Sequence, residues 1–231
     1  MRALPHTAFS GAVFRKMRGV LCFGGSFNPV HRAHLTCSAA AARAAGTPRV
    51  RLILAARSPL KGADYAVAPA ADRLAMLRLA ASDAAGEPAT ADVAFAVDDR
   101  ETRRSGASYT IVTVRELLAE PEGRADGVNW LIGADQLLSL HRWHKVEELL
   151  ALARFWVMAR PGYAIDWDAL PPLTRSLRAN VVRVPQMDVS ATDIRLRLQR
   201  GEPIEDLLTP AVARYVREHG LYGRMDSDES P

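Results

Sequence analysis

Two pairs of residues suited to binding phosphate stand close together in the segment GVLCFGGSFNPVHRAHL, residues 19–35. Gly24 and Gly25 directly follow an apolar run, where glycine permits positive φ and a close approach of a ligand to the backbone. His31 and His34 are three residues apart, a spacing that puts two side chains on one face of a helix. The segment therefore predicts a site for a negatively charged group. The same residues also fit a tight turn with surface histidines, or half a zinc site, although the sequence has no HEXXH motif or cysteine cluster.

The dipeptide Asn28-Pro29 predicts where the helix that carries the histidines begins. Asn28 can accept hydrogen bonds from the free N–H groups of a first turn, and proline fits the first helical position. A helix that starts here would direct its N–H groups and its dipole at a phosphate.

A second candidate phosphate site is SATDIR, residues 190–195. Ser190 and Asp193 have the spacing of a capping box, which by itself indicates only the start of a helix. Thr192 and Arg195 add a hydroxyl and a guanidinium beside the same helix start, and a guanidinium can contact two phosphate oxygens at once. The segment therefore predicts either a plain helix cap or a second phosphate contact.

Four further residues are candidates, each with a simpler explanation. Asp135 follows an apolar run ending at Gly133, so its carboxylate could accept from ribose hydroxyls or cap the next helix. Trp143 could stack on a flat ring or pack in the core. Ser108 could cap a helix whose free N–H groups would also suit a carboxylate. Lys61 could contact phosphate or be a solvated surface charge.

The order of apolar runs and helical patterns predicts the fold. Strands are expected at 20–23, 50–55, 93–97, 128–132, 155–158 and 181–184, and helices at 34–45, 70–82, 109–118, 135–140, 146–152, 191–200 and 209–219. This alternation predicts an α/β protein: a Rossmann-like, doubly wound parallel sheet with helices on both faces and a C-terminal helical part. Ligands of such sheets bind at the carboxyl ends of the strands, where the strand order reverses.

Composition argues against several classes of protein. The chain has 231 residues and a net charge of +4, and its arginines are scattered, so we do not expect nucleic acid as a partner. No apolar run approaches the roughly 18–20 residues that a membrane span needs. Two cysteines without a CxxC pattern indicate neither a metal site nor a disulfide framework, and we expect a cytoplasmic protein.

We expect three parts along the chain. Residues 1–18 are basic and lack acidic residues, and we interpret them as a flexible extension ahead of a start near Met17 rather than a secretion signal. Residues 19–222 are expected to form one domain, and residues 223–231 a disordered tail.

The motifs together resemble a known family. GGSFNPVHRAH resembles the GGTFDPIHxGH signature of the nucleotidyltransferase superfamily with the T/HxGH motif, and residues 19–222 resemble its bacterial nicotinate-nucleotide adenylyltransferase branch. SATDIR is similar to the ISSTxIR motif of this family, and GADQLLSLHRW to its IIGxDxxxxxxxW pattern. The chain departs from the signatures at Ser26, Asn28, Ala33, Leu60 and Ala191.

The resemblance implies a set of site residues. Catalytic roles fall to His31, His34 and Arg195. Contacts with ATP fall to Gly24, Gly25, Ser26, Phe27, Lys61, Gly133, Asp135, Ser190 and Thr192. Contacts with nicotinate mononucleotide fall to Asn28, Tyr109, Thr110, Trp143 and Arg160.

The implied reaction transfers AMP from ATP to nicotinate mononucleotide, with Mg²⁺ held mainly by the ATP phosphates and no metal site built by the protein. ATP and nicotinate mononucleotide are the expected partners, and neither nucleic acid nor a membrane is expected. The sequence leaves open whether the protein forms a homo-oligomer. The alternatives are transfer to another phosphate such as phosphopantetheine, against which Trp143 and the Tyr109-Thr110 stretch argue, and a nucleotide sensor without catalysis.

Overall fold

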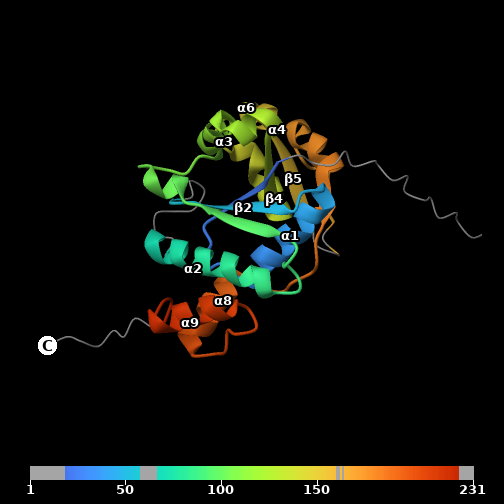
Figure 1. The fold of residues 1–231 in the computed structure, drawn as a ribbon. Helices are drawn as coiled ribbons and strands as arrows, with labels where there is room; N and C mark the ends of the chain where they lie inside the picture. Colours follow the sequence, from blue (N-terminus) through green and yellow to red (C-terminus); the bar gives the residue numbers. More distant parts are fainter. Residues whose placement is uncertain (1–18, 58–66, 160–161, 163, 224–231) are drawn as a thin grey trace, which may run out of the picture.

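A six-stranded parallel sheet forms the centre of the protein (Figure 1). The computed structural model describes residues 19–57, 67–159, 162 and 164–223. The strands are β1 (Leu21–Gly25), β2 (Arg49–Leu54), β3 (Ala94–Asp98), β4 (Val128–Gly133), β5 (Ala153–Ala159) and β6 (Val181–Arg183), in the order β3-β2-β1-β4-β5-β6. All six predicted strands are present, with ends displaced by at most two residues. The strand order reverses between β1 and β4, which pair directly.

The predicted helices are also present. They are α1 (Arg32–Ala45), α2 (Ala70–Asp83), α3 (Thr110–Ala119), α5 (Ala134–Ser139), α6 (Val146–Leu152), α8 (Ala191–Arg200) and α9 (Pro210–Glu218). Two short helices, α4 (Pro121–Asp126) and α7 (Pro172–Arg175), and four 3₁₀ turns, among them η2 (Arg100–Arg103), were not predicted. These elements are too short to show a helical period in the sequence.

Helices cover both faces of the sheet, and each face has its own hydrophobic core (Figure 1). Leu52 belongs to the core that includes residues of α1, α2, α8 and α9, whereas its neighbour Ile53 belongs to the core that includes residues of α3, α5 and α6. Successive side chains of a strand point to opposite faces, so a strand covered on both sides must be apolar throughout. The doubly wound fold predicted from the continuous apolar runs is therefore confirmed.

A group of arginines and carboxylates ties one side of the sheet together. Arg51 of β2 donates to Glu120 Oε2 at 2.8 Å, and Arg100 of η2 contacts Asp98 Oδ2 at 2.6 Å. Arg100 also donates to Glu120, so the four charges are linked; we call them the arginine–carboxylate network. Burial favours a raised pKa for the Asp98 and Glu120 carboxyls, but hydrogen bonds and charge from the arginines hold both below their ordinary values.

The two cysteines are buried and free. Cys22 belongs to the core beside α3 and Cys37 to the core beside α2, so they lie on different faces of the sheet. Burial raises the pKa of the Cys22 thiol to about 12. In the part of the chain that the structure describes, no helix is long and apolar enough to cross a membrane.

Candidate active site

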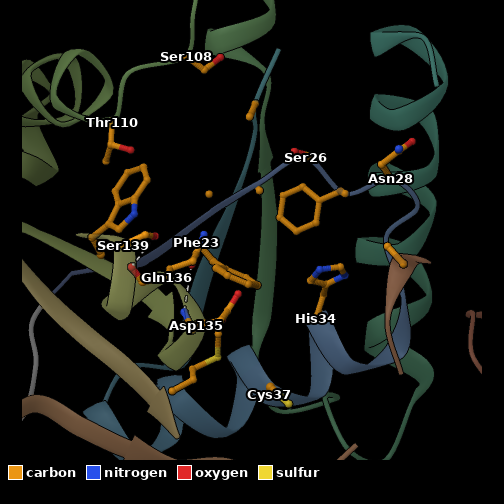
Figure 2. Close-up of a pocket in the computed structure, with 18 of the residues that line it drawn as sticks. Phe23, Ser26, Asn28, His34, Cys37, Ser108, Thr110, Asp135, Gln136 and Ser139 are labelled. Atoms are coloured by element: carbon orange, nitrogen blue, oxygen red, sulfur yellow. Dashed lines mark hydrogen bonds between the residues drawn. The ribbon is translucent and has the colours of Figure 1, made fainter. Parts of the chain in front are cut away.

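A cavity of about 1060 Å³ opens at the carboxyl ends of β1 and β4, where the strand order reverses. Figure 2 shows His34 and Asn28 on one side of it and Thr110 and Ser139 on the other. Most of the predicted site residues line this cavity: Gly24, Gly25, Ser26, Phe27, Asn28, His31, His34, Tyr109, Thr110, Gly133, Asp135, Trp143 and Ser190. The rule that ligands of such sheets bind at this edge located the cavity correctly.

The paired glycines are required by crowding rather than by backbone conformation. Neither Gly24 nor Gly25 has a positive φ, so that expectation from the sequence is wrong. A Cβ on Gly24 would lie 2.8 Å from Cζ2 of Trp130, and a Cβ on Gly25 would lie 3.1 Å from Cζ of Phe27. The two aromatic rings therefore occupy the space that larger residues would need.

The loop after β1 differs from the predicted helix start. α1 begins at Arg32 with His31 as its N-cap, three residues later than Asn28-Pro29 indicated. The Asn28–Pro29 peptide is cis, and the Asn28 side chain does not cap the helix. Its Oδ1 accepts from the Ala68 N–H at 3.0 Å and from the Tyr222 hydroxyl at 2.9 Å. Phe27 has a φ of 44°, a left-handed conformation that costs energy in a bulky residue.

The two histidines lie against each other at the start of α1. Their ring centroids are 3.7 Å apart in a stacked arrangement, and Phe27 meets the His34 ring edge-on at 5.1 Å. The backbone N–H of His31 donates to Nδ1 of His34 at 3.2 Å. An Nδ1 that accepts a hydrogen bond leaves the ring proton on Nε2. His34 is thereby set up as a neutral hydrogen-bond donor through Nε2, a group suited to phosphate oxygens.

The tip of α8 reaches the same loop from far along the sequence. Ser190 caps α8 by accepting from the Asp193 N–H at 3.0 Å and also lines the cavity. Arg195 donates through Nη1 to the Asn28 carbonyl at 2.7 Å and through Nη2 to the Thr192 hydroxyl at 3.3 Å. The helix-cap interpretation of SATDIR is therefore confirmed, and the helix starts beside the histidine loop. The phosphate contact stays a prediction. Arg195 and Thr192 are not among the residues that line the cavity.

A buried arginine holds the loops at the edge of the sheet. Arg73 of α2 is 2% exposed, and its guanidinium donates to the carbonyls of Ser26, Ala55, Ala56 and Ala68. The loops after β1 and β2 and the start of α2 are thus fastened to one side chain. No pattern in the sequence predicted this role for Arg73.

The opposite wall comes from α3 and from the turn before α6. Trp143 packs edge-on against Phe155 at 6.3 Å and also lines the cavity. Its packing interpretation is confirmed, and its stacking on a substrate ring stays a prediction. Its buried Nε1 finds no hydrogen-bond partner within the described ranges. Tyr109 lies 4.6 Å from the His144 ring, measured between centroids. The indole and the two smaller rings form an aromatic side of the cavity.

Two predicted helix caps are wrong. α3 begins at Thr110 with Tyr109 as N-cap, and Ser108 Oγ instead accepts from the backbone N–H of Ala56 at 3.0 Å. This bond ties the end of β2 to the start of α3. α5 has Gly133 as N-cap, with the Gly133 N–H donating to Gln136 at 3.0 Å, so Asp135 lies in the first turn. A Cβ on Gly133 would lie 2.3 Å from Asp135 Oδ1, so a larger residue at position 133 would require the Asp135 carboxylate to move.

Glu101 is a buried carboxyl group in the cavity wall that the sequence analysis did not single out. It is 5% exposed and accepts from the Thr113 hydroxyl. Burial raises the pKa of Glu101, while hydrogen bonds from Thr113 and Ser108 and the charge of Arg104 act against that rise. Its neighbour Arg100 belongs to the arginine–carboxylate network, so η2 separates the two environments.

Comparison with known proteins decides the family. A family model described as cytidylyltransferase-like matches residues 22–197. A probable nicotinate-nucleotide adenylyltransferase of Herpetosiphon aurantiacus is 38% identical over 210 residues, covering 89% of this chain and 99% of its own. Another from Chromobacterium violaceum is 39% identical, covering 87% and 96% of the two chains. The chain belongs to the nicotinate-nucleotide adenylyltransferase family.

Solved structures agree with the fold of this adenylyltransferase. The nicotinic acid mononucleotide adenylyltransferase of Plasmodium falciparum complexed with NaAD superposes with a TM-score of 0.67 at 16% identity, covering 89% of this chain and 97% of that one. The same enzyme complexed with APC gives a TM-score of 0.63. At such low identity the likeness supports the shared sheet and helices alone.

Two predicted ligand contacts of the adenylyltransferase, Lys61 and Arg160, lie outside the described residues. Glu101, Arg73 and Tyr222 are additions from the structure, and each is defined by contacts with residues distant in the sequence. A buried Arg73 could have been suspected from its place on the apolar side of a helix, but its four carbonyl partners could not.

Proposed function

We propose that this protein transfers the AMP part of ATP to nicotinate mononucleotide, producing deamido-NAD and pyrophosphate for NAD synthesis in the cytoplasm. The observation that carries the proposal is the meeting of two motifs at one cavity. The loop with His31 and His34 contacts the tip of α8 directly, through the 2.7 Å hydrogen bond from Arg195 to the Asn28 carbonyl. One nucleotide chain can therefore lie against both.

The reaction needs no nucleophile from the protein. The 5′-phosphate oxygen of the mononucleotide forms a bond to the α-phosphorus of ATP, and the bond from that phosphorus to the pyrophosphate oxygen breaks. Catalysis then consists of positioning and of stabilising the charge that spreads over the phosphorus oxygens. His34, whose Nδ1 accepts from the His31 N–H, offers Nε2–H as a fixed donor to those oxygens, and we assign this role to the stacked pair.

The leaving pyrophosphate is assigned to the α8 tip. Ser190 lines the cavity, and Arg195 and Thr192 follow within the first turns of α8. The positive end of the helix dipole and a guanidinium both favour phosphate there. We add Lys61 to this group and assign the adenosine to the edge formed by Gly133 and Asp135, beside the loop of Gly24, Gly25, Ser26 and Phe27.

The pyridine ring is assigned to the opposite wall. Trp143 presents an aromatic ring to the cavity, and the backbone N–H at the start of α3, at Thr110, suits a carboxylate. The Tyr109 N–H already donates to the Ala107 carbonyl, so we assign Tyr109 to this wall through its ring. Direct contacts of Asn28 and Arg160 with the mononucleotide stay predictions. Asn28 is 2% exposed and uses its side-chain oxygen within the protein, which suits a supporting role as well.

We propose that Mg²⁺ enters the cavity bound to ATP rather than to a metal site of the protein. Among the described residues no three His, Cys, Asp or Glu side chains gather to hold a metal ion. Mg²⁺ favours phosphate oxygens and water with few protein ligands. When bound, it would supply charge neutralisation to the triphosphate, and we would assign the exposed Asp135 carboxylate of the cavity to its water shell.

The test is to incubate pure protein with ATP and Mg²⁺ plus one acceptor at a time, and to measure pyrophosphate release. The acceptors are nicotinate mononucleotide, nicotinamide mononucleotide and phosphopantetheine. We expect rapid release with nicotinate mononucleotide and slower release with the amide, which lacks a carboxylate for the N–H groups of α3. Release with phosphopantetheine alone, or binding of ATP without any release, would refute the proposal.

A further inference from the structure

The last turn of the chain that the structure describes touches the catalytic loop. The Tyr222 hydroxyl donates to Asn28 Oδ1 at 2.9 Å, across 194 positions of sequence. Asn28 stands three residues before His31, in the loop that leads into α1. We propose that Tyr222 is a positioning residue for adenylyl transfer: it fixes the Asn28 side chain and, through it, the loop that presents the two histidines. This inference rests on the proposed function.

Asn28 is the point at which three distant segments meet. Its carbonyl accepts from Arg195 of α8 at 2.7 Å, and its side-chain oxygen accepts from the Ala68 N–H at 3.0 Å as well as from Tyr222. A buried amide held on both its main chain and its side chain cannot rotate without breaking one of these bonds. The direction of the following loop is therefore set in part by residues near the C-terminus.

The backbone of Tyr222 has an unfavourable conformation that the surrounding contacts must hold in place. Its φ is 65°, in the left-handed region that bulky residues avoid at a cost of about 1–2 kcal/mol. Such a conformation persists only where the surroundings hold it. Here Leu221 N–H donates to the Val216 carbonyl at 3.0 Å, and Leu221 and Tyr222 both pack against the core beside α9.

The C-terminal segment that carries Tyr222 is anchored on α2 and α1 by packing and hydrogen bonds. α9 packs along α2, as Figure 1 shows, and the Tyr215 hydroxyl donates to Asp72 Oδ1 of α2 at 2.9 Å. The Ala211 N–H donates to Asp83 Oδ2 at the other end of α2 at 2.9 Å. The Leu207 carbonyl, before α9, accepts from the Arg32 N–H at 3.0 Å, so this part also touches the first residue of α1.

Tyr215 supplies a matched control. Tyr222→Phe and Tyr215→Phe each remove one hydroxyl whose hydrogen bond is 2.9 Å long and which lies in the same C-terminal part. Only the first bond reaches the catalytic loop. Both changes should lower the melting temperature by a similar, small amount, about 2–4 °C. A merely structural role predicts similar losses of activity as well.

We expect Tyr222→Phe to lower kcat about tenfold while each KM changes less than about threefold, because a misdirected donor affects the transition state more than substrate binding. Tyr215→Phe should keep kcat within about twofold of wild type. Amide hydrogen exchange of residues 26–34 should accelerate in Tyr222→Phe and stay unchanged in Tyr215→Phe. Equal kcat values in the two variants, or unchanged exchange of the loop, would overturn the proposal.

A double-mutant cycle tests the route through Asn28. In an Asn28→Ala background, Tyr222→Phe should cause no further loss of kcat, because the acceptor is already gone. An undiminished additional loss would show that Tyr222 acts elsewhere. Should the alanine variant fail to fold, Asn28→Asp keeps an acceptor oxygen, and there the tenfold effect of Tyr222→Phe should persist. If the wild-type protein catalyses no adenylyl transfer, the proposed function is refuted. Amide hydrogen exchange of residues 26–34 would still show whether Tyr222 positions the loop.

Discussion

At the cavity, Arg73 and Arg195 donate to backbone carbonyls, whereas in the arginine–carboxylate network Arg51 and Arg100 donate to carboxylates. Both regions use arginine side chains, but the hydrogen-bond acceptors differ. A carbonyl accepts the hydrogen bond without cancelling the charge of the guanidinium. A carboxylate accepts the bond and cancels the charge as well.

The difference separates what binds a substrate from what holds the fold. A triphosphate carries several negative charges, so a cationic group that directs loops through carbonyls also favours the ligand. The network instead neutralises its own charges and joins β2, β3, η2 and the residue before α4. We therefore expect substitutions in the first region to change turnover, and those in the second to change stability.

The largest expected effect is at the histidine pair. His34→Ala removes the Nε2 donor fixed by the His31 N–H, and kcat should fall about 10²–10³-fold, the usual cost of losing a transition-state donor. The free energy of unfolding should change little, because His34 is only half-buried. Steady-state kinetics and urea denaturation measure the two quantities. His141→Ala, an exposed histidine absent from the cavity lining, is the control. Near-normal turnover of His34→Ala would remove the histidines from the mechanism.

A pair of arginine variants tests the comparison directly. Arg195→Ala should lower kcat/KM about a hundredfold, since it removes a guanidinium assigned to the pyrophosphate and a bond to the Asn28 carbonyl. Arg51→Ala should leave kcat/KM within about twofold but reduce the free energy of unfolding by about 1–3 kcal/mol, between the values for exposed and buried ion pairs. The comparison fails if Arg51→Ala loses turnover as Arg195→Ala does.

Arg195→Lys sharpens the same test. Lysine keeps the charge but lacks the planar fork that reaches two acceptors at once. We expect an intermediate loss, smaller than that of Arg195→Ala. Full activity with lysine would mean that charge alone matters and that the bond to the Asn28 carbonyl contributes nothing.

The fold and the location of the site could be predicted because both depend on local patterns. Apolar runs such as residues 128–132 identify strands, and parallel strands bring their carboxyl ends to one edge, so Gly25 and Gly133 were expected at the same edge. The direct pairing of β1 with β4, which makes them neighbours, came from the structure. Ser190 was predicted as a helix cap from spacing alone, and it is one.

The details of the catalytic loop could not be predicted because they depend on contacts between distant residues. His31 caps α1 in place of Asn28, and Asn28 is occupied by Ala68 and Tyr222, which stand 40 and 194 positions away. Glycine is needed at position 24 because the ring of Trp130 fills the space of a Cβ, and not because the backbone has a positive φ. Composition and periodicity carry no information on such pairings.

The smallest expected effect is the response of the arginine–carboxylate network to acid. The pKa values of Asp98 and Glu120 lie below the ordinary carboxyl values in the folded protein. Carboxyl groups with lowered pKa stabilise the fold fully above their unfolded values, near about pH 4, and lose this contribution as the pH falls through the folded values. The free energy of unfolding should therefore decrease below about pH 4, and urea denaturation at a series of pH values measures it.

Asp98→Asn identifies the source of that decrease. The amide cannot titrate, so the variant should be less stable than wild type at neutral pH, and the two should converge in acid. Glu101→Gln should behave in the opposite way. Since burial raises the pKa of Glu101, its carboxyl group favours the fold most in acid, and this contribution is lost as the pH rises through the folded value. Removing it should make the loss of stability in acid steeper than in wild type. Parallel pH profiles for the two variants would mean that the carboxylates on the two sides of η2 do not differ, and the distinction between the two regions would then rest on the arginines alone.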